Sequence, residues 1–282
     1  MALLTLHGVE LPSGETIPVL GQGTWHLGQG RHPRSEELEA LRLGIELGMT
    51  LIDTAEMYGV GRAEKLVGEA VGGRRDDVFL VSKVLPSHAT RRGTIAACQA
   101  SLRRLGTDRL DLYLLHWRGA IPLEETVAAF EELRDAGLIR HWGVSNFDLV
   151  DLEQLLGIKD GSNVQTDQVL YNLSRRGIEW NLLPWCVAHG MPAMAYSPLG
   201  QGRLLEHPVL RGIAVQYRVS PAQVALAWVL AHAGVCAIPE AGTVKHVRQN
   251  RAALDLRLRE IDMIKLDEAF PPPVTPQPLE ML

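Results

Sequence analysis

Residues 78–83 have the sequence VFLVSK, an almost unbroken apolar run that ends on a lysine. A run of this kind is typical of a parallel strand that is buried on both faces of a sheet. Seven other short β-rich runs recur along the chain, with helical periods between them. These runs span residues 19–22, 50–53, 110–116, 139–144, 163–168, 191–196 and 236–239.

The segments between the runs carry helix signals. Ser220, Pro221 and Gln223 supply an N-cap, a proline at the first helical position and a capping-box glutamine. Ser35 and Thr94 are expected to open two further helices. Eight strand–helix units in 282 residues predict an α/β fold of the (β/α)8 TIM-barrel type. Periodicity alone leaves a doubly wound parallel sheet open.

Both ends of the chain depart from this alternation. Residues 1–18 predict a β-hairpin, with its turn at 12–14, that closes the bottom of the barrel. Residues 271–282 are rich in proline and predict an irregular tail. Because no linker composition divides the chain, residues 1–282 are expected to form a single domain.

Composition excludes several classes of protein. Hydrophobic residues make up 46% of the chain, which is ample for a core and excludes global disorder. The net charge of −5 gives no basic footprint for nucleic acid. Three cysteines without a C-x-x-C pair favour a reducing cytoplasm, and the apolar stretch 224–238 is too short for a membrane span. We therefore expect a soluble, cytoplasmic protein that is a monomer.

Polar side chains end the expected strands. In a barrel, chemistry gathers at the carboxyl ends of the strands, so these side chains are expected to form the rim of one active site. They are Asp53, Lys83, His116, Ser145, Asn146, Gln168, Tyr196 and Glu240.

Six motifs around these positions resemble the aldo-keto reductases. They are LIDTAEMYG (51–59), LVSKV (80–84), LDLYLLHW (110–117), GVSNF (143–147), QVLYN (168–172) and AYSPLGQG (195–202). The motifs occur in the family's order and cover nearly all of the chain. The sequence is most similar to compact bacterial members that reduce small aldehydes such as methylglyoxal. The resemblance implies a TIM barrel and reduction of a carbonyl substrate by a nicotinamide cofactor.

The resemblance also implies roles for four side chains. Tyr58 is expected to be the general acid, with Lys83 and Asp53 lowering its pKa, and His116 is expected to orient the carbonyl. The chemistry agrees, because an oxygen that gains charge on hydride transfer needs a proton, and an ammonium favours a phenolate. Each residue also has a purely structural interpretation when it is taken alone. Asp53 and Lys83 could form an ordinary ion pair at the rim, Tyr58 could be a packing residue, and His116 could be a hydrogen-bonded histidine near a strand end.

Cofactor and substrate contacts follow from the same motifs. Tyr196 is expected to stack on the nicotinamide, while Ser145, Asn146 and Gln168 bond its carboxamide. The turn that carries Ser197, Leu199, Gly200 and Gly202 is expected to wrap the pyrophosphate. Trp25 and Trp117 follow predicted strands and are expected to wall the substrate pocket. Because the loop after His116 and the tail are both short, an open pocket is expected.

The stretch IPEAGTVKHVRQN (238–250) departs from the family. Members that use NADP place a lysine and an arginine where this chain has Glu240 and His246, while Thr243 and Asn250 keep the expected character. NADP(H) is implied by the resemblance, and NAD(H) use is expected because a carboxylate suits an unphosphorylated ribose. Lys245 and Arg248 are alternative cations for the 2′-phosphate. Glu240→Lys is expected to raise the preference for NADPH about tenfold.

Two other functions compete with this hypothesis. A cofactor-binding redox sensor or regulatory subunit on the same barrel would show little turnover. A metal-dependent barrel hydrolase would need clustered ligands, and the ten histidines include no H-x-H or H-E-x-x-H motif. We therefore expect no metal site.

Overall fold

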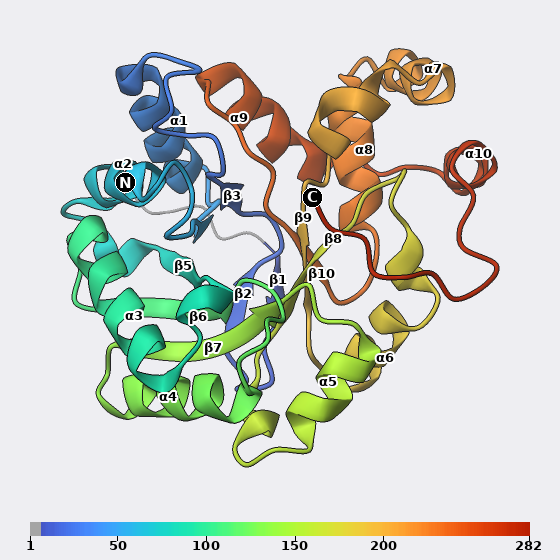
Figure 1. Ribbon diagram of the computed structural model, residues 1–282. Coiled ribbons are helices and arrows are strands. Elements are labelled where there is room, and N and C mark those ends of the chain that lie inside the picture. The colour runs from blue at the N-terminus through green and yellow to red at the C-terminus, as the bar shows by residue number, and fades with distance from the viewer. Residues whose placement is uncertain (1–6) are drawn as a thin grey trace.

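The computed structural model describes residues 7–282 and contains a sheet of eight parallel strands in the order of the sequence. Each strand lies beside the next along the chain, as in Figure 1. The strands are β3 (Gln22–Gly23), β4 (Leu51–Asp53), β5 (Phe79–Val84), β6 (Leu110–Leu115), β7 (Ile139–Ser145), β8 (Asp167–Leu170), β9 (Ala193–Tyr196) and β10 (Val235–Ala237).

Backbone contacts between the first and last strands close the sheet. Leu20 pairs with Ala237, and Gly23 pairs with Glu240, both in the parallel sense. The Gly21 N–H donates to the carbonyl of Ala237 at 2.8 Å, and a Cβ at Gly21 would lie 2.5 Å from the Leu51 carbonyl. The expected barrel is confirmed, and the open doubly wound sheet is wrong.

In the described part of the chain, ten α-helices follow or flank these strands and surround the barrel (Figure 1). They are α1 (Arg34–Glu46), α2 (Arg62–Val71), α3 (Arg91–Leu105), α4 (Leu123–Asp135), α5 (Leu149–Leu156), α6 (Leu182–Ala188), α7 (Pro208–Tyr217), α8 (Pro221–Leu230), α9 (Val244–Ala252) and α10 (Glu260–Ala269). Short 3₁₀ turns span Arg75–Asp77, Pro86–His88, Gly161–Asn163, Gly177–Glu179, Gly200–Glu206 and Ala253–Asp255.

Helix caps test the expected starts. Ser220 accepts from the Gln223 N–H and forms the complete capping box, as expected. The start at Thr94 is wrong, because Thr90 caps α3 and accepts from Gly93 while Thr94 donates to the His88 carbonyl from inside the first turn. Ser35 lies inside α1 and does not cap it, because the helix begins one residue earlier, after Pro33.

Two strands differ from the expected bounds more than the others do. The run 163–168 begins too early, since a 3₁₀ turn occupies Gly161–Asn163 and β8 starts at Asp167. The first barrel strand is shorter than the run 19–22 and lies further along the chain, at Gln22–Gly23. Residues 164–168 are buried on both sides of the point where the ladder begins, so burial alone does not mark where pairing begins.

The N-terminal hairpin lies under the barrel. It consists of β1 (Gly8–Glu10) and β2 (Thr16–Pro18), which pair antiparallel; the start of the expected hairpin, residues 1–6, lies outside the described residues. Leu11 and Ile17 are buried against the inner cluster of barrel side chains, which includes Leu51 and Val81. The hairpin therefore closes the end of the barrel opposite the polar strand ends.

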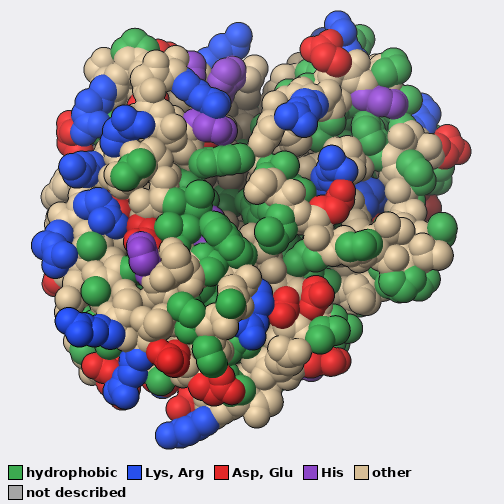
Figure 2. All heavy atoms as spheres, in the orientation of Figure 1, with side chains coloured by type: hydrophobic (Ala, Val, Ile, Leu, Met, Phe, Trp, Pro, Cys, Tyr) green, Lys and Arg blue, Asp and Glu red, His purple; other side chains and the backbone are tan. Residues whose placement is uncertain are grey.

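The segment after α10 has no regular structure and returns across the barrel. Figure 1 shows this tail, in dark red, running from α10 toward the middle of the face that carries the polar strand ends. Figure 2 shows that the same face is hollowed between the α1–α9 side and the α7–α8 side, with histidine and basic side chains along the upper lip. Within residues 7–282, no helix is long and apolar enough to cross a membrane.

Candidate active site

The Lys83 ammonium bonds to three groups at the carboxyl ends of the strands. Lys83 stands at the end of β5 and is fully buried. Its Nζ donates to the Asp53 carboxylate at 2.7 Å, to the Thr54 carbonyl at 3.0 Å and to the Tyr58 hydroxyl at 3.0 Å. All three N–H groups of the ammonium are therefore satisfied, and their directions are fixed.

The Asp53 carboxylate is fixed from two sides. One oxygen accepts from Lys83, and the other accepts from the Gln168 side-chain amide at 2.8 Å. Burial raises the pKa of Asp53 and lowers the pKa of Lys83, and the contact between the two charges opposes both shifts. The buried pair thus places a cation at a defined position with little freedom to move.

Tyr58 lies in the loop between β4 and α2. Burial raises the pKa of the Tyr58 phenol well above 10.0, with the Asp53 charge adding to the shift. Desolvation of the phenolate is the largest cause, so the net shift of this pKa runs against the lowering that the sequence predicts from Lys83. The phenol holds its proton, which is the state that a proton donor requires.

The loop that carries Tyr58 is held by Glu56. The Glu56 carboxylate accepts from the Leu85 N–H at 2.8 Å and contacts the His88 ring at 2.9 Å. Sequence reasoning did not single out Glu56, although the residue stands between Asp53 and Tyr58 in the motif. These contacts tie the end of β5 to the loop that carries Tyr58.

His116 directly follows β6, and its ring lies against that of Tyr58. The two rings meet edge to face, with centroids 5.7 Å apart. Burial and the Lys83 charge lower the pKa of His116 to about 2, so the imidazole is neutral. A neutral imidazole with a free N–H can donate a hydrogen bond to a carbonyl oxygen without bringing a second charge into the site.

A cavity of about 140 Å³ adjoins these side chains. Trp25 and Trp117 both line it, where the sequence predicts them, together with Met57. Met281 and Leu282 also line it, so the tail reaches the site. The expectation of an open pocket is wrong on this side, because the irregular tail folds back over the barrel. The full lining is Trp25, Met57, Tyr58, His116, Trp117, Ser145, Asn146, Gln168, Tyr196, Met281 and Leu282.

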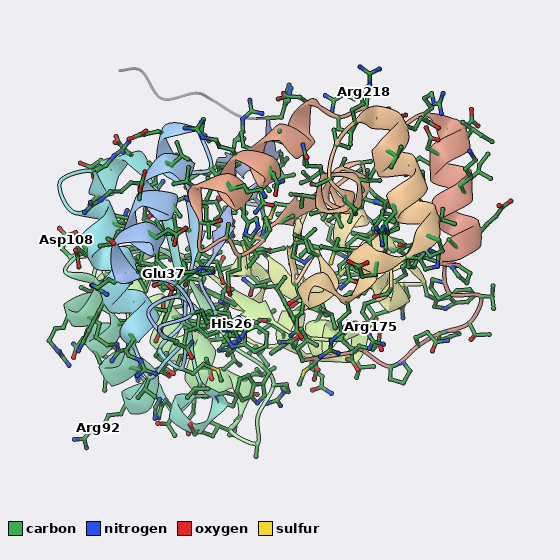
Figure 3. The ribbon with its side chains drawn as sticks, turned by 90° about the horizontal axis from the view of Figure 1, so that it is seen from above. His26, Glu37, Arg92, Asp108, Arg175 and Arg218 are labelled. Carbon is green, nitrogen blue, oxygen red and sulfur yellow. The ribbon has the colours of Figure 1, made fainter. Side chains whose placement is uncertain are left out.

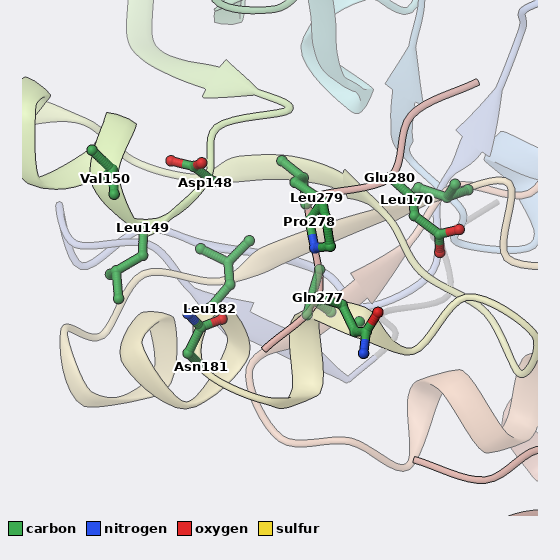
Figure 4. A pocket seen from close by; sticks show the side chains of 12 residues that line it. Asp148, Leu149, Val150, Leu170, Asn181, Leu182, Gln277, Pro278, Leu279 and Glu280 are labelled. Atoms are coloured by element: carbon green, nitrogen blue, oxygen red, sulfur yellow. The ribbon is translucent and has the colours of Figure 1, made fainter. Parts of the chain in front are cut away.

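The tail is held by packing and by charge. Leu279 packs against the hydrophobic core, and Glu280 forms an ion pair with Arg175 at 2.6 Å. Figure 4 shows Gln277, Pro278, Leu279 and Glu280 on one side of a small cavity with α5 and α6 side chains opposite. These contacts fix the path of the tail into the site.

A larger cleft of about 270 Å³ continues from the first cavity and shares Trp25, Tyr58 and Tyr196 with it. Ser197 and Gly202 in its wall have left-handed backbones, with φ of 47° and 83°. Nothing lies within 4 Å of the place where a Cβ of Gly202 would stand. The turn therefore leaves room for a phosphate beside its backbone, and the residues present fit a dinucleotide cofactor.

The expected cofactor residues are divided between this cleft and other places. Tyr196, Ser197, Leu199, Gly202 and Glu240 line the cleft. Gly200 and the α9 residues Thr243, His246 and Asn250 are not among the lining residues of its described surface. Thr243 instead caps α9 by accepting from the His246 N–H at 3.3 Å, and Asn250 is buried.

The expected carboxamide partners bond one another. Tyr196 donates its hydroxyl to the Asn146 carbonyl oxygen at 2.9 Å, and the Asn146 amide donates to the His116 backbone and to Ser145. The Ser145 hydroxyl donates to the backbone of Gln168 at 2.8 Å. This network orients Tyr196 over the junction of the two cavities.

Glu240 is turned toward the loop between β3 and α1. Its carboxylate accepts from the His26 backbone N–H at 2.9 Å and contacts the His26 ring at 3.0 Å. Arg31, from the same loop, also lines the cleft. The sequence analysis did not single out His26 or Arg31. The sequence signal that pointed to them is Glu240, because a carboxylate in place of the family's lysine needs a different partner. Among residues 7–282, no three His, Cys, Asp or Glu side chains gather where they could hold a metal.

Known proteins match this chain along nearly its whole length. Residues 19–270 match the Aldo/keto reductase family. The chain is 52% identical to the methylglyoxal reductase YeaE of Escherichia coli, covering 97% of this chain and 98% of that protein. It is 37% identical to a glyoxal reductase of Bacillus subtilis, covering 92% and 91%.

Solved structures agree with these matches. An aldo/keto reductase from Klebsiella pneumoniae, crystallised with NADP and acetate, superposes with a TM-score of 0.95 at 49% identity. The superposition covers 99% of this chain and all of that one. The fold thus recurs in a related enzyme, and this chain belongs to the aldo/keto reductase family.

Proposed function

We propose that this aldo/keto reductase reduces small aldehydes, methylglyoxal among them, to alcohols with a nicotinamide dinucleotide. The observation that carries the proposal is the Tyr58 hydroxyl, protonated and 3.0 Å from the buried Lys83 ammonium, at the junction of the two cavities. The relatives named for methylglyoxal and glyoxal reduction support the substrate class.

A bound nicotinamide would supply hydride to the carbonyl carbon, and the side chains would manage the oxygen. His116 donates its N–H to the carbonyl oxygen and orients the substrate. Tyr58 gives its proton to that oxygen as charge develops on it. Lys83 stabilises the resulting phenolate through the existing 3.0 Å contact, and Asp53 holds the ammonium in place. Trp25 and Trp117 keep water from the reacting atoms.

The cofactor is NADP(H), with NAD(H) accepted as well. The relative crystallised with NADP supports the first part. Glu240 supports the second, because a carboxylate in the cleft wall discriminates against an additional phosphate. Tyr196, with its hydroxyl tied to Asn146, presents a ring face to the nicotinamide. Ser145 and Gln168 belong to the same hydrogen-bond network as Asn146. The turn bearing Leu199, Gly200 and Gly202 accommodates the pyrophosphate.

Residues 1–282 work as one catalytic domain and as a monomer, and the family match over residues 19–270 supports the single domain. The 271–282 tail is part of that domain, since it lines the substrate cavity. Cys98, Cys186 and Cys236 are buried free thiols, which supports a reducing compartment such as the cytoplasm.

Steady-state rates test the proposal. Methylglyoxal and benzaldehyde would each be assayed with NADPH and with NADH. We expect turnover on both aldehydes, with NADPH favoured and NADH used. Cofactor binding without turnover on any aldehyde would instead indicate a redox sensor or regulatory subunit, and failure to bind either dinucleotide would overturn the proposal.

A further inference from the structure

The cleft for the dinucleotide has an unusual charge balance. Three of its sixteen lining residues carry a full charge at neutral pH, namely Arg31, Asp53 and Glu240. The charge of Asp53 is neutralised by its ion pair with Lys83. The Glu240 carboxylate and the Arg31 guanidinium are then the remaining charged groups that line the cleft. A dinucleotide brings at least two negative charges on its phosphates, so the cleft requires a cation that the carboxylate does not supply.

We propose that Arg31 is the side chain that binds the phosphates of the dinucleotide. This inference rests on the proposed function. Arg31 shares the cleft wall with Gln201 and Gly202 of the turn after β9, whose left-handed backbone leaves space beside it. Within residues 7–282, no carboxylate forms an ion pair with the Arg31 guanidinium. The guanidinium is therefore available for the bidentate contact that suits a phosphate.

The loop that carries Arg31 is anchored on both sides of it. Before it, the Glu240 carboxylate accepts from the His26 backbone at 2.9 Å, and Glu37 accepts from the Gly28 backbone at 2.9 Å. Figure 3 labels His26 and Glu37. After it, the His32 ring packs on the backbone of Gly242, where a Cβ would lie 2.4 Å from the ring.

These anchors explain the carboxylate at position 240. A lysine there would have no oxygen to accept the His26 N–H, whereas a carboxylate accepts it. Glu240 thus fixes the loop between β3 and α1, and that loop carries Arg31 to another part of the same cleft. Glu240 therefore has two opposite effects on cofactor binding. Its charge repels the phosphates, while its hydrogen bond holds the loop whose Arg31 attracts them.

Direct binding measurements test the role of Arg31. Quenching of tryptophan fluorescence would give Kd for NADPH, NADH and adenosine 2′,5′-bisphosphate, because Trp25 lines the cleft. We expect Arg31→Ala to weaken NADPH binding by about tenfold or more and Arg31→Lys to restore part of the loss. Arg34→Ala is the matched control, since Arg34 is three residues away but pairs with Glu69, and it should change each Kd less than about twofold.

The three ligands identify which phosphate is bound. Equal weakening of NADPH and NADH assigns Arg31 to the pyrophosphate, which its position beside Gly202 favours. Weakening of NADPH and the bisphosphate alone assigns it to the 2′-phosphate. Wild-type affinity of Arg31→Ala for all three ligands overturns the inference and leaves the proposed function intact. If the wild-type protein binds no dinucleotide, both fail.

A pair of variants separates the two effects of Glu240. Glu240→Gln keeps an oxygen for the His26 N–H and loses the charge, so we expect tighter binding of both dinucleotides. Glu240→Ala loses both, so it should bind them more weakly than Glu240→Gln does. Identical Kd values for the two variants would show that the anchor does not contribute, and would contradict that part of the inference.

Discussion

The Lys83 ammonium donates a hydrogen bond to the phenolic oxygen of Tyr58 at 3.0 Å. The contact joins a buried cation to a half-buried phenol whose pKa is raised well above 10.0 by desolvation. The phenol therefore keeps its proton until charge appears on a nearby oxygen, and the ammonium is already in place to stabilise the phenolate that forms.

Removing the Tyr58 hydroxyl tests this relationship. Tyr58→Phe keeps the ring and removes the proton donor, so we expect kcat to fall by about 10² or more. The Kd for NADPH, measured by fluorescence, should be unchanged, and the circular dichroism spectrum should match that of the wild type. Near-normal turnover would show that Tyr58 is not the proton donor.

The pH dependence of reduction follows from the same two groups. The pKa of His116 is lowered to about 2, and that of Tyr58 lies well above 10.0. Both groups are therefore in their active protonation states between these limits. We expect kcat for aldehyde reduction to be flat from about pH 5 to about pH 9, measured by stopped-flow single turnover. A bell centred near neutrality would show that one of these groups titrates in that range.

Asp167 carries a buried carboxyl group at the start of β8, one residue before Gln168. One oxygen accepts a long contact from the Phe147 N–H at 3.4 Å, and the other has no partner among residues 7–282. Burial raises its pKa well above 3.8. The folded state thus holds a proton that the unfolded chain releases above pH 3.8, and stability falls by about 1.4 kcal/mol per pH unit from there up to the folded pKa.

Asp167→Asn removes this titration while keeping an oxygen for the Phe147 N–H. We expect the variant to be more stable than the wild type at pH 7 and to lose that advantage as the pH falls toward 4. Urea titrations at the two pH values would check this. An equal difference at both pH values would contradict the buried neutral carboxyl.

Val60 occupies a strained backbone position. Its φ is 57° and its side chain is 90% exposed, beside Gly59 and Gly61. A β-branched residue is disfavoured in the left-handed region, and this side chain buries no surface in return. Val60→Asn should raise the free energy of unfolding by about 1 kcal/mol, as measured in urea. A variant less stable than the wild type would rule out strain at this position.

The tail supplies a test of the substrate cavity. Leu279 packs against the core, whereas Val274 on the same tail is 82% exposed. Leu279→Asp places a charge against apolar side chains and should lift the tail, which raises KM for methylglyoxal by about fivefold or more. Val274→Asp adds the same charge without that contact and should leave KM unchanged. Equal KM values in both variants would show that the tail does not shape the cavity.

The sequence by itself determined the fold and the chemistry of the rim. Alternation of apolar runs such as 78–83 with helical periods is a local property, and it predicted the eight strand–helix units of the barrel. The turn residues at 12–14, also a local signal, predicted the hairpin beneath it. Polar residues such as Lys83 and His116, placed where strands end, predicted one shared site because parallel strands finish at the same face.

The tertiary structure alone decided the pKa of Tyr58 and the surroundings of the cofactor cleft. Burial of the phenol depends on neighbours far apart in the sequence, and its desolvation outweighed the Lys83 charge that sequence reasoning relied on. Glu240 and His26 are 214 residues apart, and the loop between β3 and α1 meets position 240 only when the barrel closes. Electrostatic effects depend on distance and solvent exposure, which residue order does not contain.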